Sequence, residues 1–253
     1  MVMACDVLLK CENLCVGYGA SRPKRGAERP LSLFEPFSFE LHAGEVVALM
    51  GVNGCGKSTL LKTFAGLVPQ VSGDVFLDGE PLQAWNARER ARRVGLVRMS
   101  GTAPDRMTVR EFVGLGRSPY SGFLDGRTAE DERIVDDAMQ ATDVACFAER
   151  PFTELSDGER SRVFLAEAVA QQVNVLLLDE PNAFLDIPRS HALFRLLKKF
   201  VGMREMGIIV STHSIEYAEK YCDRIAVIDG GCFRVAPASE ARTLGLLDWA
   251  RDE

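Results

Sequence analysis

The segment best suited to chemistry runs from Gly51 to Thr59 and reads Gly-Val-Asn-Gly-Cys-Gly-Lys-Ser-Thr. This is the pattern G-x-x-x-x-G-K-[ST], with an apolar, strand-like run at residues 46–49 before it and a helical pattern after it. Glycine permits positive φ, so successive backbone N–H groups can point at a phosphate chain, and the N-terminus of the following helix adds its dipole. The segment therefore predicts a site for a nucleoside triphosphate.

The side chains of this segment have separate predicted roles. Lys57 is expected to reach the β- and γ-phosphates, and the hydroxyl of Ser58 is expected to hold Mg²⁺. The alternative is a glycine-rich turn without a ligand, which the complete spacing and context disfavour. The other predicted nucleotide contacts are Gly51, Asn53, Gly54, Cys55, Gly56 and Thr59.

Cysteines are scattered at seven positions without a C-x-x-C pair, so neither a zinc site nor a disulfide framework is expected. Cys55 differs from the other cysteines because it lies inside the phosphate loop. A helix N-terminus can lower the pKa of a thiol, so we expect a thiol alkylator to react at Cys55 and to block nucleotide binding.

Two adjacent carboxylates follow the wholly apolar run at residues 175–178. Such a run indicates a central parallel strand that is buried on both faces. Asp179, at the strand end, is expected to support Mg²⁺, and Glu180 is expected to accept a proton from the attacking water. One carboxylate is enough for nucleotide binding, so the pair predicts hydrolysis of the nucleotide. The alternative interpretation of Asp179 and Glu180 is two charges at a strand end that face solvent.

A second candidate anion site begins at Ser156. The spacing from Ser156 to Glu159 is that of a capping box, and Asp157 and Gly158 lie between them at the predicted start of a helix. Taken alone, this is a well-capped helix, but a helix N-terminus also attracts anions. Because the chain already has one triphosphate site, the second would serve a nucleotide that is held by another copy of the protein.

The elements that position these residues alternate between strands and helices, which predicts a parallel sheet with ligands at the carboxyl ends of its strands. We expect an edge strand at residues 6–16, an exposed basic loop at 21–26 and a helical block at 108–148, with a capping box from Thr128 to Asp131. A helix with Pro188 in its first turn is expected to end at Gly207, and a short helix is expected at residues 244–249.

Composition narrows the class of protein. The chain of 253 residues has a net charge of −6, which argues against a large nucleic-acid footprint, so no nucleic-acid partner is expected. It contains no run of 18 apolar residues and begins without the pattern of a secretory signal. We therefore expect a cytoplasmic protein that contacts a membrane only through a partner.

The segment from Leu155 to Glu159 resembles the LSGGQ signature of ATP-binding cassette (ABC) proteins, and the order of motifs agrees over nearly the whole chain. Tyr18 matches the aromatic loop, residues 51–58 match Walker A, and residues 175–180 match Walker B. Residues 182–186 match the D-loop, and His213 matches the switch histidine.

The resemblance implies a single cassette over residues 1–253 that binds ATP and Mg²⁺. The implied fold class is α/β, a P-loop NTPase (RecA-like) core with a parallel central sheet, an N-terminal antiparallel β subdomain and an inserted α-helical subdomain. Residues 1–98 and 158–253 would form the core with the β subdomain, and residues 99–157 the insertion. Two copies would pair head to tail, so that each ATP lies between one Walker A motif and the signature of the partner.

The resemblance also assigns roles to single residues. His213 would contact the γ-phosphate, Asp186 would link the two sites of the dimer, and Tyr18 would stack on the nucleobase, with simple hairpin packing as the alternative for Tyr18. Asp157 and Glu159 replace a glycine and a glutamine of the signature. Met99 stands where the family has the glutamine of the Q-loop, and a methionine cannot bind Mg²⁺ or orient water.

The stretch from Thr108 to Tyr120 looks like the helical lobe of importer subunits for iron-siderophore, haem or cobalamin, with Gly-Arg-x-Pro-Tyr at 116–120 as its most specific part. The likeness implies that the region from Met99 to Asp125 receives an integral membrane permease, and that a substrate-binding protein is an indirect partner. The protein would then lie on the inner face of the cell membrane. The alternatives are an exporter subunit, a soluble non-transport cassette ATPase and a metabolite kinase.

Overall fold

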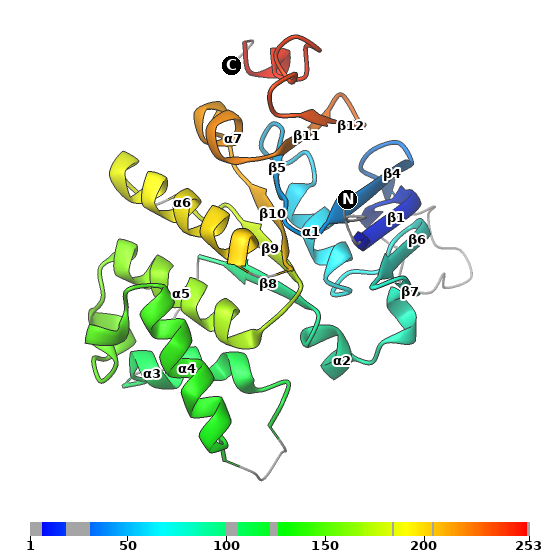
Figure 1. Ribbon diagram of the computed structural model, residues 1–253. Coiled ribbons are helices and arrows are strands. Elements are labelled where there is room, and N and C mark those ends of the chain that lie inside the picture. The colour runs from blue at the N-terminus through cyan, green and yellow to red at the C-terminus, as the bar shows by residue number, and fades with distance from the viewer. Residues whose placement is uncertain are drawn as a thin grey trace, which may run out of the picture.

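The computed structural model describes residues 7–18, 31–99, 106–121, 126–183, 185–203 and 205–251, and Figure 1 shows its arrangement of strands and helices. The predicted mixed α/β class with a parallel sheet is confirmed. The α-helices are α1 (Lys57–Phe64), α2 (Ala87–Ala91), α3 (Val109–Gly114), α4 (Ala129–Ala141), α5 (Asp157–Gln171), α6 (Ile187–Met203) and α7 (Ile215–Tyr221).

Six of the described strands form the central sheet, in the order β12-β11-β5-β10-β9-β8. β12 pairs antiparallel with β11, and the other neighbours are parallel. Side chains of β5 and β10 are buried throughout, as their continuous apolar runs predict for strands that are covered on both faces. The strands are β5 (Val46–Met50), β8 (Val94–Arg98), β9 (Val175–Asp179), β10 (Gly207–Ser211), β11 (Arg224–Asp229) and β12 (Cys232–Pro237).

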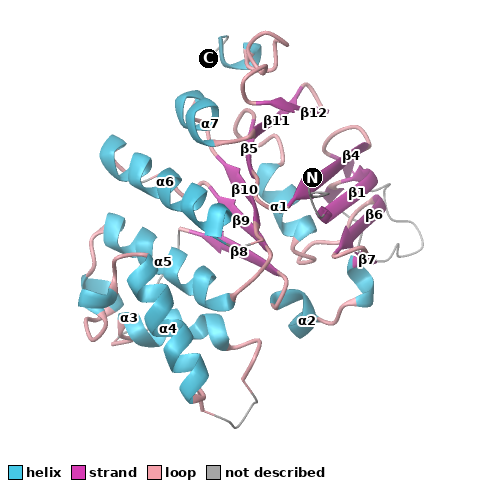
Figure 2. Ribbon diagram, viewed as in Figure 1, coloured by secondary structure: helices cyan, strands magenta, loops and turns pink. Residues whose placement is uncertain are grey.

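Alternate residues of each central strand point to opposite faces, so every strand contributes to two cores. Val46, Ala48 and Met50 of β5 pack with residues of α5, α6 and α7. Val47 and Leu49 pack instead with residues of α1 and of the second sheet. Figure 2 shows the same division, with α5 and α6 on one side of the central sheet and α1 on the other.

The second sheet is antiparallel, in the order β4-β1-β6-β7. The predicted edge position of its first strand is wrong, because β1 pairs with β4 on one side and with β6 on the other. Its loose alternation reflects a sheet with one solvated face: Lys10 and Glu12 form an exposed ion pair, while Leu9 and Cys11 are buried. The strands are β1 (Val7–Cys15), β4 (Phe37–His42), β6 (Ser72–Leu77) and β7 (Glu80–Pro81).

A short pair of strands, β2 (Gly17–Tyr18) and β3 (Leu31–Ser32), flanks the predicted basic loop. Residues 21–26 of that loop lie outside the described residues. Two other predictions are wrong in detail. Helix α6 ends at Met203, whereas Gly207 is the first residue of β10, where a Cβ would lie 2.8 Å from the carbonyl oxygen of His42. The last helix is a 3₁₀ turn, Asp248–Arg251, rather than a helix over 244–249.

Helices α3, α4 and α5 form a lobe beside the sheet (Figure 1). Rings of Phe112, Phe152 and Phe164 meet at its centre, with centroids 4.5 to 5.5 Å apart. The predicted capping box of Thr128 and Asp131 opens α4. Helix α5 packs on β8 as well as on α3 and α4. The division of the chain at residues 98/99 and 157/158 stays a prediction.

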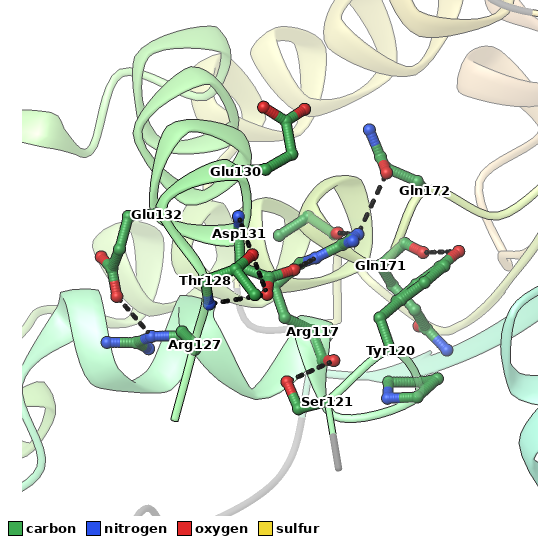
Figure 3. Close-up of polar contacts among 12 residues, drawn as sticks. Arg117, Tyr120, Ser121, Arg127, Thr128, Glu130, Asp131, Glu132, Gln171 and Gln172 are labelled. Carbon is green, nitrogen blue, oxygen red and sulfur yellow. Dashed lines mark hydrogen bonds and ion pairs between the residues drawn. The ribbon is translucent and has the colours of Figure 1, made fainter. Parts of the chain in front are cut away.

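The Gly-Arg-x-Pro-Tyr stretch forms an internal contact between α4 and α5 (Figure 3). Arg117, only 5% exposed, pairs through Nε with Oδ1 of Asp131 at 2.8 Å and donates through Nη1 to the carbonyl oxygen of Ala170 at 2.8 Å. The ring of Tyr120 lies 3.9 Å from the Arg117 guanidinium carbon, and its hydroxyl donates to the carbonyl oxygen of Gln171. The most specific part of the importer likeness therefore stabilises the lobe, because its arginine is turned inward.

The backbone between Arg117 and Tyr120 is hydrogen-bonded to α2 and to the residue that follows it. Arg88 of α2 and Arg92, which follows α2 as its C-cap, both donate to the carbonyl oxygen of Pro119, at 2.7 and 2.9 Å. Gln171, at the end of α5, donates to the carbonyl oxygen of Ala91 at 2.7 Å. One end of the lobe is thus joined to α2 by several hydrogen bonds.

Replacing Asp131 by asparagine is expected to remove stability on the order of 2 kcal/mol at neutral pH. Arg117 and Thr128 hydrogen-bond the carboxylate and lower the pKa of Asp131 from 3.8 to about 2. Because the folded pKa lies below the unfolded one, the contribution is complete above about pH 4 and is lost as the pH falls toward about 2. Urea unfolding at pH 7 and at pH 3 measures the difference between variant and wild type, which should shrink at pH 3.

Asp137→Asn is the matched control, because Asp137 lies on the same helix in an exposed pair with Arg133 at 2.9 Å. Such a pair contributes only about 0.3–0.5 kcal/mol. Equal losses for the two variants at pH 7 would contradict a structural role for the buried pair of Arg117 and Asp131.

Candidate nucleotide site

The phosphate loop connects β5 to α1, and its glycines have the conformations that the motif predicts. Gly51, Gly54 and Gly56 have φ values of 140, 79 and 108°. A Cβ on Gly51 would lie 2.3 Å from the carbonyl oxygen of Ile228, so only glycine fits there. Among the described residues, α1 has Gly56 as its N-cap and no side-chain capping bond, so this helix end suits an anion.

Lys57 is buried, with 5% of its surface exposed, at the first position of α1. Its Nζ donates to the carbonyl oxygens of Gly51 at 2.7 Å and Val52 at 3.1 Å, so the charge is held along the loop. Of the other predicted contacts, Asn53 and Gly54 are exposed at the tip of the loop, and Thr59 is buried in α1.

The side chain of Asp179 contacts residues from three other elements: α1, β10 and β8. Its Oδ1 accepts from the hydroxyls of Ser58 at 3.0 Å and Ser211 at 3.2 Å. Its Oδ2 lies 3.4 Å from Nε of Arg98. The structure therefore brings the two predicted metal-supporting residues together. The sequence reasoning did not identify Ser211 and Arg98, which end β10 and β8, the two strands on either side of β9.

Glu180 and His213 meet just beyond the ends of β9 and β10. Oε1 of Glu180 lies 2.9 Å from Nε2 of His213, and both side chains are 40% exposed. The backbone N–H of Glu180 donates to the Ser211 hydroxyl at 2.8 Å, and Glu180 has a φ of 50°, an uncommon value for a non-glycine residue. Together with Asn182 and Thr212, the two residues line an open pocket of about 380 Å³.

The segment from Ser156 to Glu159 forms the capping box that its spacing predicts. The hydroxyl and the backbone N–H of Ser156 both donate to Oε2 of Glu159 at 2.8 Å, and these bonds lower the pKa of Glu159. Gly158 lies under the side chain of Arg189, whose Cδ is 2.7 Å from where a Cβ would be. Ser156, Gly158 and Glu159 line a groove of about 660 Å³ with residues of α4 and α6, apart from the phosphate loop.

Asp186 and Tyr18 are the remaining predicted site residues. Oδ1 of Asp186 accepts from the backbone N–H of Arg189 at 2.9 Å, so it stabilises the first turn of α6. Tyr18 belongs to β2, but its side chain lies outside the described residues, and its stacking on a nucleobase stays a prediction. Met99 is half-buried and packs against the core.

The expected lowering of the Cys55 pKa is wrong. Burial raises the pKa of the Cys55 thiol, and the nearby charge of Lys57 offsets this only in part. The thiol is half-buried, so loss of hydration of the thiolate outweighs the field of the helix N-terminus.

Alkylation with N-ethylmaleimide is therefore expected to be slower at Cys55 than at Cys146, whose side chain is exposed. Saturating ATP should slow the reaction of Cys55 further and leave that of Cys146 unchanged. Peptide mass mapping after timed labelling measures both rates in one sample. Faster labelling of Cys55 than of Cys146 would contradict the effect of burial.

The fold and the loop geometry define a P-loop ATPase, and comparison with known proteins narrows the class. The model of the ABC transporter family matches residues 34–183. The hemin import ATP-binding protein HmuV of Streptomyces coelicolor is 42% identical over 217 residues, which cover 85% of this chain and 76% of that protein. The ferric enterobactin transport ATP-binding protein FepC of Escherichia coli is 34% identical, covering 88% of this chain and 79% of that protein.

A solved structure shares the fold: an inward-facing, putative metal-chelate type ABC transporter superposes with a TM-score of 0.82 at 24% identity, covering 97% of this chain and 89% of the other. The chain belongs to the ABC transporter family. It is an ATP-binding subunit that binds nucleotide and hydrolyses ATP. None of the helices in the described part of the chain is long and apolar enough to cross a membrane.

Proposed function

We propose that this ATPase powers import of an iron-siderophore, haem or cobalamin-type molecule through a membrane permease. The observation that supports this most directly is the set of relatives, because HmuV is named for hemin import and FepC for ferric enterobactin transport. A third relative, CbrD of Dickeya dadantii, is named for achromobactin transport and is 36% identical over 197 residues. An exporter subunit is the second candidate, because it would use the same nucleotide site.

Mg²⁺ is the metal that fits the site. A hydroxyl from Ser58 and a carboxylate from Asp179, 3.0 Å apart, are oxygen ligands of the kind that Mg²⁺ prefers. Held there together with ATP, Mg²⁺ would supply positive charge that stabilises the phosphates during hydrolysis. Ser58 would hold it directly, and Asp179 would support it while Ser211 keeps the carboxylate in place.

In the proposed mechanism, the backbone N–H groups of residues 51–59 and Nζ of Lys57 hold the triphosphate, and Tyr18 stacks on the base. Glu180 accepts a proton from the attacking water through its carboxylate. His213, 2.9 Å from that carboxylate, orients it and contacts the γ-phosphate. Its 40% exposure leaves His213 accessible to a phosphate group.

We further propose that the site is completed by a second copy of the chain. Ser156, Gly158 and Glu159 of the signature line a groove whose described lining includes no residue of the phosphate loop, which supports a role toward the nucleotide of another chain. In a head-to-tail homodimer they would face the triphosphate of the partner, and Asp186 would link the two sites. A solved cassette with a TM-score of 0.76, MJ0796, is described as dimeric.

The permease is proposed to contact the region from Met99 to Asp125, which would place the protein on the cytoplasmic side of the membrane. Arg117 is buried in its pair with Asp131 and therefore belongs to the support of this region rather than to its surface. A substrate-binding protein would act through the permease, and no nucleic acid is involved.

Uptake in whole cells tests the function. A strain that lacks this chain should accumulate less radiolabelled haem or ferric siderophore, and uptake should return with the wild-type chain but not with Glu180→Gln. Co-purification of a multi-spanning permease would identify the partner. A strain that retains more of the labelled compound than wild type would indicate export instead.

A further inference from the structure

Arg98 places a second protein cation, besides Lys57, at the candidate nucleotide site. It is the last residue of β8, and the register of the sheet places it directly beside Asp179 in β9. Its Nε lies 3.4 Å from Oδ2 of Asp179. The Asp179 side chain is 9% exposed, whereas that of Arg98 is 47% exposed, so the carboxylate is fixed and the guanidinium can reorient.

The hydrogen bonds of Asp179 divide between its two oxygens. Ser58 and Ser211 donate to Oδ1, which leaves Oδ2 to Arg98. Among the ion pairs of the described residues, Arg98 is the partner of Asp179. A guanidinium and a divalent ion compete for the same carboxylate oxygens, so this contact bears directly on how the site uses metal.

Met99, the next residue along the chain, does not compete with Arg98 for Asp179. Met99 is apolar, half-buried and packed against the core, so it offers no hydrogen bond at the end of the strand. Arg98 is therefore the polar side chain that this end of β8 presents to Asp179. Its planar group carries five N–H donors and can hold two phosphate oxygens at once.

We propose that Arg98 binds the triphosphate at the side where Mg²⁺ is held, an inference that rests on the proposed nucleotide site. Without metal, Arg98 neutralises Asp179; with nucleotide, its guanidinium turns to the terminal phosphate. Two consequences follow from this position. ATP binding depends less on Mg²⁺ than it would without the arginine, and the affinity of the ATP complex for Mg²⁺ is reduced because the guanidinium already neutralises phosphate charge that the ion would otherwise neutralise.

The inference is tested by measuring the equilibrium affinities of wild type, Arg98→Ala and Arg98→Lys for ATP and for ADP. Each affinity is measured once in EDTA and once in Mg²⁺. In EDTA, Arg98→Ala should weaken ATP binding by about 10-fold, the loss of one charge-assisted phosphate contact, and ADP binding by much less. Arg98→Lys should keep most of the ATP affinity. In a Mg²⁺ titration of the ATP complex, Arg98→Ala should need less Mg²⁺ for half saturation than wild type.

Arg133→Ala is the matched control, because it removes the same charge from an exposed position on α4. Thermal melting should show that all variants remain folded. The inference is overturned if Arg98→Ala binds ATP in EDTA as wild type does, or if it weakens ATP and ADP equally. A wild-type chain that binds no ATP even with Mg²⁺ would instead overturn the proposed nucleotide site.

Discussion

Replacing Glu180 by glutamine is expected to lower the rate of ATP hydrolysis by about 10²- to 10⁴-fold and to leave ATP binding intact. Glutamine has nearly the same shape but cannot accept a proton from water. The backbone N–H of Glu180 bonds to Ser211 and its carboxylate contacts His213, so the group that is proposed to accept the proton is held beside the switch histidine. Phosphate release under saturating ATP and Mg²⁺ measures the rate, and equilibrium binding of ATP measures the affinity.

The same variant tests the dimer. If hydrolysis reopens the interface, Glu180→Gln should accumulate as an ATP-bound dimer, which light scattering after gel filtration can detect. Glu216→Gln is the matched control, because Glu216 is exposed on α7 and close to His191 rather than to Glu180. A monomer of Glu180→Gln at saturating ATP and Mg²⁺ would argue against a site shared between two chains.

Replacing Lys57 by alanine is expected to weaken ATP binding by about 100-fold or more. Lys57 begins α1 with its Nζ held against the loop by Gly51 and Val52, so its charge faces the same space as the backbone N–H groups. Its removal takes away the charge-assisted bonds to the β- and γ-phosphates. Titration with a fluorescent ATP analogue measures the affinity.

Lys62→Ala provides the control for Lys57, since it removes a lysine from the last turn of the same helix. It should bind ATP as wild type does. Because Lys57 is buried, the melting temperature of both variants must be measured alongside. Tight ATP binding by a folded Lys57→Ala protein would contradict the assigned role of the phosphate loop.

Local sequence patterns predicted the parts of the site that lie within one loop or one strand end. The phosphate loop, the pair of Asp179 and Glu180 and the cap of Ser156 each depend on spacing over a few residues, and the structure gives them the expected local geometry. The roles of these side chains toward ATP and Mg²⁺ stay predictions.

Contacts that depend on the order of strands in the sheet could not be predicted from local sequence patterns. Arg98 and Ser211 reach Asp179 only because β8 and β10 lie on either side of β9, a neighbour relation that no short pattern encodes. The error at Cys55 has a different origin. The position of a thiol at a helix start can be predicted from sequence, but its burial, which decides the direction of the pKa change, depends on tertiary packing.

The buried contact of Arg117 with Asp131 has a mechanical consequence for the lobe. Helix α5 is anchored at its C-terminal end, where Gln171 also bonds to α2. At its other end, Ser156 and Glu159 border an open groove. If the lobe rotates about the anchored residues 170–172, the N-terminal end of α5 would move farther than its C-terminal end. In the proposed homodimer, such a rotation would change the distance between Ser156–Glu159 and the triphosphate of the partner.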